Sequence, residues 1–116
     1  MRLNCVNIAT TNMAEMKTFY SLLLRAEGYQ RTPGRCELSA DNVTIVLTHT
    51  DIKTPVNPDC CGLEFYVDDV DAEYIRLTQA GIIAENEPVT LPWQYRYFAV
   101  KDPDGNHIDL VQYVGE

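Results

Sequence analysis

Hydrophobic and polar residues follow two different spacings along this chain, and the order of these spacings repeats once. Over residues 13–24 the apolar side chains recur three and four positions apart, which predicts a helix with a buried stripe of Met13, Met16, Phe19, Tyr20, Leu23 and Leu24. Asn12 with Glu15 predicts a capping box at the start of this helix. Gly28 is the predicted left-handed residue beyond its end.

Segments with a strand-like pattern surround the helix. Strands are predicted at residues 3–9, 29–32, 35–39 and 43–48. Residues 51–59 contain two prolines and show no periodicity, which indicates a linker. The same order then starts again, with a strand at 62–67, a helix capped by Asp68 or Asp69 and ended by Gly81, and strands at 82–85, 95–100 and 107–113.

The repeat predicts the fold class. Residues 40–47 align without a gap over residues 103–110, and their apolar positions coincide. In the turn at 102–106, Pro103 presets φ, Gly105 can take a positive φ, and Asp102 and Asn106 can bond local backbone. We therefore expect an α+β fold, with a first βαβββ module at 1–50, a linker at 51–60 and a second module at 61–116 in a single domain spanning 1–116.

Composition and charge narrow the partners. Seventeen acidic residues against nine basic ones give a net charge of −8, which disfavours nucleic acid and favours cations, although acidity also simply keeps a protein in solution. No apolar run approaches the roughly 18 residues of a membrane span, so no membrane partner is expected. The first residues lack a signal-peptide pattern, which predicts a cytoplasmic location and four reduced cysteines: Cys5, Cys36, Cys60 and Cys61.

Three motifs carry a resemblance to a known family. They are Asn4–Ile8 followed by Phe19 and Tyr20 in the helix, Phe65–Asp71 at the start of the second half, and Lys101–Gln112 near the end. In this order they cover nearly the whole chain. The sequence resembles the vicinal oxygen chelate superfamily, which includes glyoxalases, bleomycin-resistance proteins and extradiol dioxygenases. This resemblance implies a cupped, mixed β-sheet with helices on its outer face.

The resemblance also implies where a divalent metal would bind in catalytic members. The usual ligands are a His on the first strand of each half and a Glu on the last strand. These positions are Cys5 and Gly62 on the first strands, with Asp109 and a place close to Val46 on the last. Gly62 and Val46 have no donor side chain, so no cofactor is expected. Cys5, Glu64 and Asp109 are weak metal candidates, with His107 beside Asp109 able to add a donor.

Strand alternation predicts which side chains face a binding cleft. The Asp109 side chain is predicted to point to the sheet face opposite the helix-facing Ile108 and Leu110. On the other strand, Glu64 and Tyr66 are predicted to share the face of Gly62. Each side chain has a structural alternative: a solvated carboxylate, a small buried thiol, or an aromatic ring packed at a subunit interface. The predicted cleft residues are Cys5, Asn7, Glu64, Tyr66, Trp93, Tyr95, Tyr97, His107 and Asp109.

Two functions remain open at this point, together with a purely structural, dimerising role. The first is a metal-free small-molecule-binding protein, similar to bleomycin-resistance proteins, that sequesters a cationic or aromatic ligand. The alternative is a metal-dependent lyase, isomerase or dioxygenase that resembles glyoxalase and uses atypical ligands. The resemblance further implies a homodimer.

Overall fold

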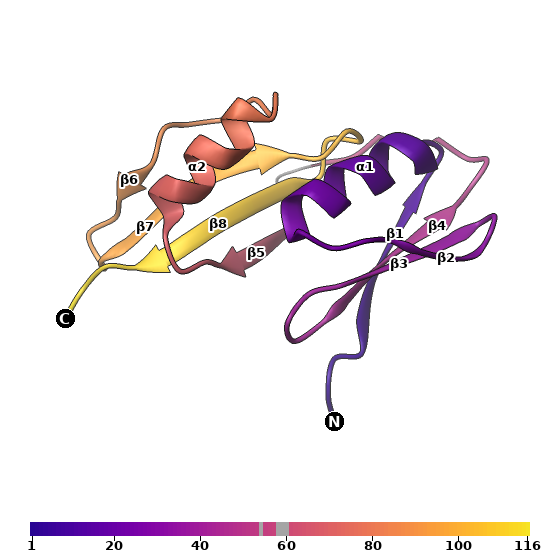
Figure 1. Cartoon of the computed structure of the whole chain (residues 1–116), viewed down its shortest axis with the longest axis horizontal. Helices are drawn as coiled ribbons and strands as arrows, with labels where there is room; N and C mark the ends of the chain where they lie inside the picture. Colours follow the sequence, from indigo (N-terminus) through magenta and orange to yellow (C-terminus); the bar gives the residue numbers. More distant parts are fainter. Residues whose placement is uncertain (54, 58–60) are drawn as a thin grey trace. The chain divides into compact units, whose positions relative to one another are not determined.

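The computed structural model describes residues 1–53, 55–57 and 61–116, which form two compact units, Met1–Pro55 and Val56–Glu116 (Figure 1). The first unit contains β1 (Cys5–Thr10), α1 (Met13–Leu24), β2 (Tyr29–Thr32), β3 (Arg35–Ser39) and β4 (Thr44–His49). The second contains β5 (Gly62–Tyr66), α2 (Val70–Gln79), β6 (Val89–Thr90), β7 (Tyr95–Lys101) and β8 (His107–Tyr113). The boundary between the units lies inside the predicted linker.

Each unit builds one mixed sheet of four strands, and the two sheets have the same topology. Their strand orders are β1-β4-β3-β2 and β5-β8-β7-β6. In both, the first strand pairs in parallel with the last, and the remaining pairs are antiparallel. The expected α+β fold with two βαβββ modules is confirmed.

The strand registers show which positions of the two modules are equivalent. Cys5 pairs with Thr44 in the first sheet, and Gly62 pairs with His107 in the second. Two residues further on, the pair Asn7 and Val46 corresponds to the pair Glu64 and Asp109. Cys5 and Gly62 are therefore equivalent, as are Val46 and Asp109.

Each helix covers one face of its own sheet. Helix α1 packs on β3 and β4 and buries the predicted stripe at Met16, Phe19, Tyr20 and Leu23, while Met13 and Leu24 are half-buried. Helix α2 packs on β7 and β8, where the Tyr74 ring meets Phe98 edge-on at 5.3 Å between centroids. The residues predicted to face the helix, Ile108 and Leu110, are buried.

Both predicted ends of α1 require correction. Asn12 is the N-cap but makes no side-chain cap bond; its amide donates to Glu15 Oε2 at 2.9 Å. The reciprocal box does not form because the Asn12 N–H already donates to Thr10 Oγ1. At the other end the left-handed residue is Arg25, with φ 51°, and not Gly28.

Gly28 instead permits close packing. A Cβ added there would lie 2.7 Å from Cys36 Sγ and 3.1 Å from Lys17 Cε. The first of these separations is shorter than a van der Waals contact. Burial around the Cys36 thiol raises its pKa, so this cysteine behaves as a packed apolar side chain.

The predicted strand at 82–85 is also wrong. Residues 82–88 form an irregular loop with a bend at residues 85 and 86, and the short strand of this region is β6, at Val89–Thr90. One backbone bond, from Glu85 N–H to the Ala99 carbonyl at 2.8 Å, ties the loop to β7. Two adjacent apolar residues, Ile82 and Ile83, are a weak indication of a strand, because an alternating pattern can be recognised only over a longer segment.

The turn between β7 and β8 forms as predicted. Gly105 has φ 94°, and the buried Asp102 carboxylate accepts from the backbone N–H groups of Asp104 and Asn106 at 3.0 and 2.9 Å. The Asn106 side-chain amide donates to its second oxygen at 2.7 Å. The turn therefore sets where β8 starts, which fixes the register of His107 and Asp109 against β7.

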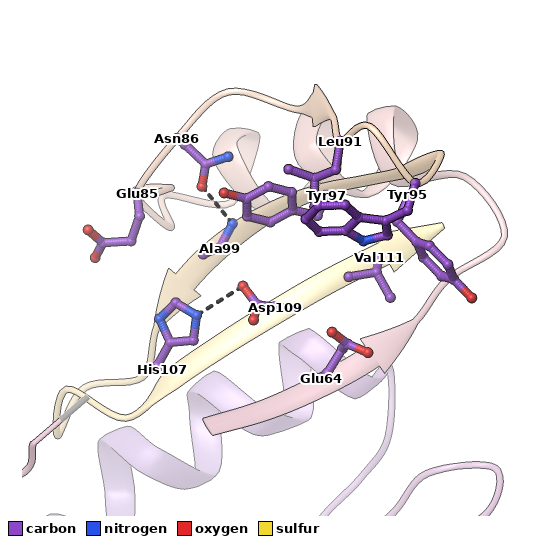
Figure 2. A pocket seen from close by; sticks show the side chains of 11 residues that line it. Glu64, Glu85, Asn86, Leu91, Tyr95, Tyr97, Ala99, His107, Asp109 and Val111 are labelled. Atoms are coloured by element: carbon purple, nitrogen blue, oxygen red, sulfur yellow. Dashed lines mark hydrogen bonds and ion pairs between the residues drawn. The ribbon is translucent and has the colours of Figure 1, made fainter. Parts of the chain in front are cut away.

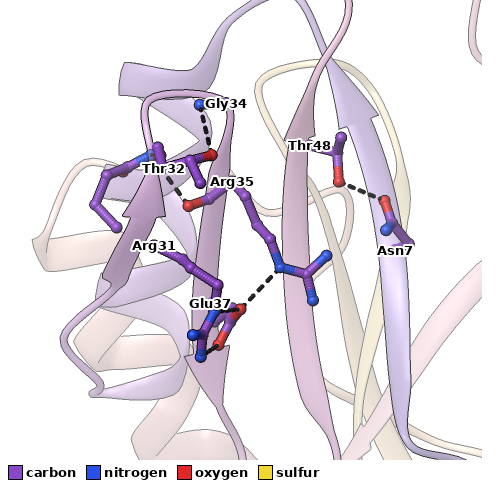
Figure 3. A network of polar contacts seen from close by, with 8 residues as sticks. Asn7, Arg31, Thr32, Gly34, Arg35, Glu37 and Thr48 are labelled. Carbon is purple, nitrogen blue, oxygen red and sulfur yellow. Dashed lines mark hydrogen bonds and ion pairs between the residues drawn. The ribbon is translucent and has the colours of Figure 1, made fainter.

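In the first unit the sheet face opposite α1 carries a polar network around Glu37 and a separate hydrogen bond between Thr48 and Asn7 (Figure 3). Glu37 accepts from Arg31 Nε at 2.6 Å and from Arg35 Nε at 2.8 Å. Thr48 donates to the Asn7 side-chain oxygen at 2.9 Å. The two guanidinium groups lower the pKa of Glu37 to about 2, mainly through hydrogen bonds from Arg31 and then Arg35.

This network predicts a pH dependence of folding. Glu37 has a folded-state pKa of about 2 against 4.5 as its ordinary value. Its stabilising contribution is therefore complete above about pH 4.5 and is lost as the pH falls toward 2. In Glu37→Gln the free energy of unfolding should vary less between these pH values than in the parent chain, as measured by urea unfolding. Glu27→Gln, an exposed glutamate outside the network, is the control; an equal loss of pH dependence there would contradict the assignment.

No helix in the described part of the chain is long and apolar enough to cross a membrane.

Candidate functional site

A pocket of about 550 Å³ opens on the second sheet, on the face away from α2 (Figure 2). All of its lining residues belong to the second unit, and they come from β5, β7, β8 and the two loops on either side of β6. They are Glu64, Glu85, Asn86, Leu91, Trp93, Tyr95, Tyr97, Ala99, His107, Asp109 and Val111.

Strand pairing brings the lining side chains onto this face. Asp109 on the central strand β8 pairs with Glu64 on one side and Ala99 on the other. Val111, two residues along β8, pairs with Tyr97. Because alternate residues point to the same face, these side chains form a continuous surface. Ala99 leaves space above the sheet, since its side chain is a single methyl group.

One end of the pocket is acidic. His107 Nε2 lies 2.9 Å from Asp109 Oδ1, and both side chains are about one-third exposed. Glu64 and Glu85 add two exposed carboxylates, and Lys101, which is not a lining residue, has its Nζ 3.8 Å from Glu85 Oε1. The lining contains three carboxylates and no lysine or arginine, so the local potential favours a cation.

The other end is aromatic. Tyr95 and Tyr97 are half-buried on β7, whereas Trp93 is 64% exposed in the turn that enters this strand. Leu91 closes the turn, since its N–H donates to the Tyr95 carbonyl at 2.8 Å and its carbonyl accepts from Gln94 N–H at 2.9 Å. Gln94 takes a left-handed φ of 67°, which this type of three-residue hairpin loop requires. The tight turn holds Trp93 at the pocket's rim.

The loop between α2 and β6 supplies two lining residues that were not predicted from the sequence, Glu85 and Asn86. Asn86 accepts from the Ala99 N–H at 3.0 Å and donates to the Glu87 carbonyl at 2.9 Å, which fixes the loop beside Glu85. No local pattern marked either residue, because Glu85 was the last residue of a predicted strand and Asn86 lies outside every predicted strand. Ala99 and Val111 could have been predicted from the sequence. Each lies two residues after a predicted cleft residue, Tyr97 or Asp109, and therefore points to the same face of its strand. Leu91 lies outside every predicted strand.

Three predicted cleft residues do not line the pocket. Tyr66 shares its face but lies beyond it on β5. Cys5 and Asn7 belong to the first unit, where Cys5 is a half-buried free thiol and Asn7 bonds Thr48. Cys61 is exposed and free, and Cys60 lies outside the described residues.

The donor set does not fit the metal site that the resemblance implies. Among the residues that the structure describes, no three His, Cys, Asp or Glu side chains are placed to hold a metal ion. The His107 nitrogen nearest Asp109 is occupied by that carboxylate. A Cβ at Gly62 would lie 3.2 Å from His107 Cδ2, so the imidazole crowds the position where a first-strand ligand would stand.

The fold and the pocket define a duplicated βαβββ protein with an acidic and aromatic cavity on one module. A comparison with protein families identifies it further: the profile described as the Glyoxalase/Bleomycin resistance protein/Dioxygenase superfamily matches residues 2–110. The chain belongs to this superfamily.

Solved structures share the fold. A glyoxalase/bleomycin resistance protein/dioxygenase family enzyme from Burkholderia phytofirmans is 18% identical, with a TM-score of 0.82 over 98% of this chain and 100% of that one. TioX from Micromonospora gives 18% identity and a TM-score of 0.78, covering 98% and 100% of the two chains. Lactoylglutathione lyase from Agrobacterium tumefaciens is 18% identical, with a TM-score of 0.74 over 95% of this chain and 92% of that one. Among curated proteins, none matches this sequence significantly.

Proposed function

We propose that this protein binds a cationic, aromatic small molecule in the pocket of its second module, without a metal ion. The observation that carries the proposal is that three carboxylates and three aromatic side chains line the same cavity of about 550 Å³. This volume is within the usual range for small-molecule sites, which are mostly apolar with a few placed polar groups.

The chemistry of each end supports a ligand of this kind. Carboxylates at Glu64 and Asp109 attract an ammonium or similar group, and the net charge of −8 raises the local concentration of cations. Indole is the best of the aromatic side chains for cation–π contact, and phenol rings stack well on planar groups. The superfamily's name covers both enzymes and resistance proteins, so the pocket chemistry, and not the family, leads us to propose a binding protein.

Trp93 is the chain's one tryptophan, which makes its fluorescence a direct probe of the pocket. Titration with benzylammonium should give a saturable change in Trp93 emission that weakens as salt is added. The neutral benzyl alcohol should give a much weaker change, because it has the ring without the charge. Equal affinity for benzyl alcohol, or tighter binding of benzoate, would contradict the proposal.

Metal titration separates the alternative, a metal-dependent lyase, isomerase or dioxygenase. The carboxylate and imidazole side chains of the pocket are Glu64, Glu85, His107 and Asp109, and no three of these described residues are placed to hold a metal ion. Calorimetric titration with zinc, nickel and manganese should therefore show no stoichiometric binding. A stoichiometric site of micromolar or tighter affinity would replace our proposal by the enzymatic one.

We also propose that the chain acts in the cytoplasm as a homodimer of single-domain subunits. The likeness to the superfamily supports the dimer, and Cys5, Cys36 and Cys61 form no disulfide in the described part of the chain, as a reducing compartment would favour. Sedimentation equilibrium measures the subunit number directly.

A further inference from the structure

Tyr66 and Tyr113 continue the pocket face beyond the cavity, next to the lining residue Tyr95. Tyr66 on β5 pairs with the pocket residue Val111, and Tyr113 lies two residues beyond Val111 on β8. Tyr95 on β7 pairs with Tyr113 and also lines the pocket. Alternation places all of them on the face of Glu64 and Asp109. We call Tyr66, Tyr95 and Tyr113 the tyrosine row.

Contacts within the row hold the rings in place. The Tyr95 and Tyr113 rings lie 5.5 Å apart between centroids at 62°, an edge-on arrangement. The Tyr66 hydroxyl accepts from the Tyr113 backbone N–H at 3.3 Å, so the Tyr66 side chain reaches from β5 across to β8. The Tyr113 hydroxyl donates to the Glu116 carbonyl at 3.4 Å.

Despite these contacts the row stays accessible. Tyr66 is 61% exposed and Tyr113 is 42% exposed, although both are large and mostly apolar side chains. Since their hydroxyl groups are tied to backbone, a partner would meet ordered ring surfaces and would lose little side-chain entropy on binding.

The row and the carboxylates have a defined separation. Asp109 and Tyr113 are four residues apart on β8, which corresponds to about 13 Å at the usual rise of a strand, and Glu64 and Tyr66 are two apart on β5, or about 7 Å. The apolar side chain of Val111 lies between Asp109 and Tyr113 on β8. Along β8 this face therefore changes from acidic at Asp109 to apolar at Val111 and aromatic at Tyr113.

We propose that the tyrosine row is a second subsite, which takes the planar aromatic end of an elongated cation whose charged end lies at Glu64 and Asp109. This inference rests on the proposed function and specifies its ligand class. Charge complementarity orients the ligand, because the carboxylates select the cationic end and the exposed rings accept an aromatic group. A compact cation fills only the cavity and leaves Tyr66 and Tyr113 uncovered.

Calorimetric titration with three probes tests this ligand class: benzylammonium, hexylammonium and phenylhexylammonium. The last two have the same charge and chain, and only the last can place a ring on the row. In the parent chain, phenylhexylammonium should bind about tenfold more tightly than hexylammonium, the size of gain expected from aromatic contacts. In Tyr66→Leu and in Tyr113→Leu this ratio should fall toward one.

Tyr29→Leu is the matched control, since Tyr29 is 59% exposed but lies in the first unit. Its ratio should stay near ten, and thermal melts show that each variant is folded. A ratio near one in the parent chain, or a ratio that survives both substitutions, would overturn the second subsite. So would a change in sedimentation mass caused by Tyr66→Leu, because the row would then be a contact between chains.

The outcome for benzylammonium distinguishes the two proposals. If benzylammonium binds to the parent chain but phenylhexylammonium binds no more tightly than hexylammonium, only the proposal of a second subsite is contradicted. If benzylammonium and both longer cations fail to bind, the proposed function fails and this inference fails with it.

Discussion

Replacing Asp109 by asparagine should weaken binding of benzylammonium about tenfold, which corresponds to about 1.4 kcal/mol. Asparagine has the shape of aspartate, and its side-chain oxygen can still accept from His107 Nε2, which lies 2.9 Å from the present carboxylate oxygen. The substitution therefore removes a charge while leaving the local hydrogen bond available. Trp93 fluorescence reports the affinity.

The pairing of Asp109 with Glu64 sharpens this prediction. Their positions are directly opposite on β8 and β5, so Glu64→Gln should weaken the same cation, and the double variant should lose more than either single one. Glu87→Gln is the control, because it removes the same charge from the same unit at an exposed residue outside the pocket lining. An equal effect in this control would mean that net charge, and not the pocket, attracts the ligand.

Asp102→Ala should lower the free energy of unfolding by about 2–4 kcal/mol, as expected when a buried acceptor is removed and its donors are left unpaired. Asp102 is only 4% exposed, and its carboxylate accepts from two backbone N–H groups and from the Asn106 amide. Alanine offers no acceptor to these donors. Urea unfolding followed by circular dichroism measures the loss.

Two further variants test the cause. Asp104→Ala changes a half-exposed residue of the same turn and should alter stability by less than about 0.5 kcal/mol. Asp102→Asn keeps one acceptor oxygen and should fall between the parent chain and Asp102→Ala. If Asp102→Ala is as stable as Asp104→Ala, the hydrogen bonds of this carboxylate do not stabilise the turn.

Much of the fold was predictable because its determinants are local. The helical spacing from Met13 to Leu24 matches α1, and the β-branched run around Ile45 became β4. Pro103 and Gly105 identified the tight turn, since few residues adopt the required backbone angles. One error arose where another group competed for the same bond, because the Thr10 hydroxyl took the N–H that a capping box at Asn12 needs.

The candidate site was predictable only in part. Alternation identified the face of Glu64, Tyr97 and Asp109, because the period of a strand is two. It could not show that Glu85 and Asn86 join them, because a loop's path depends on tertiary bonds such as that between Asn86 and the Ala99 N–H. Whether the lining residues bind a ligand stays a prediction.

By itself, the sequence determined the duplicated βαβββ order. It also determined which positions of the two modules correspond, such as Val46 in the first and Asp109 in the second, because periodicity and turn chemistry act over neighbouring residues. The tertiary structure decided how the two equivalent faces differ. In the first sheet Glu37 draws Arg31 and Arg35 into a closed network, whereas Ala99 at the matching position of the second sheet leaves room for a pocket. Such a difference depends on side chains from several strands meeting across the sheet, which no local pattern records.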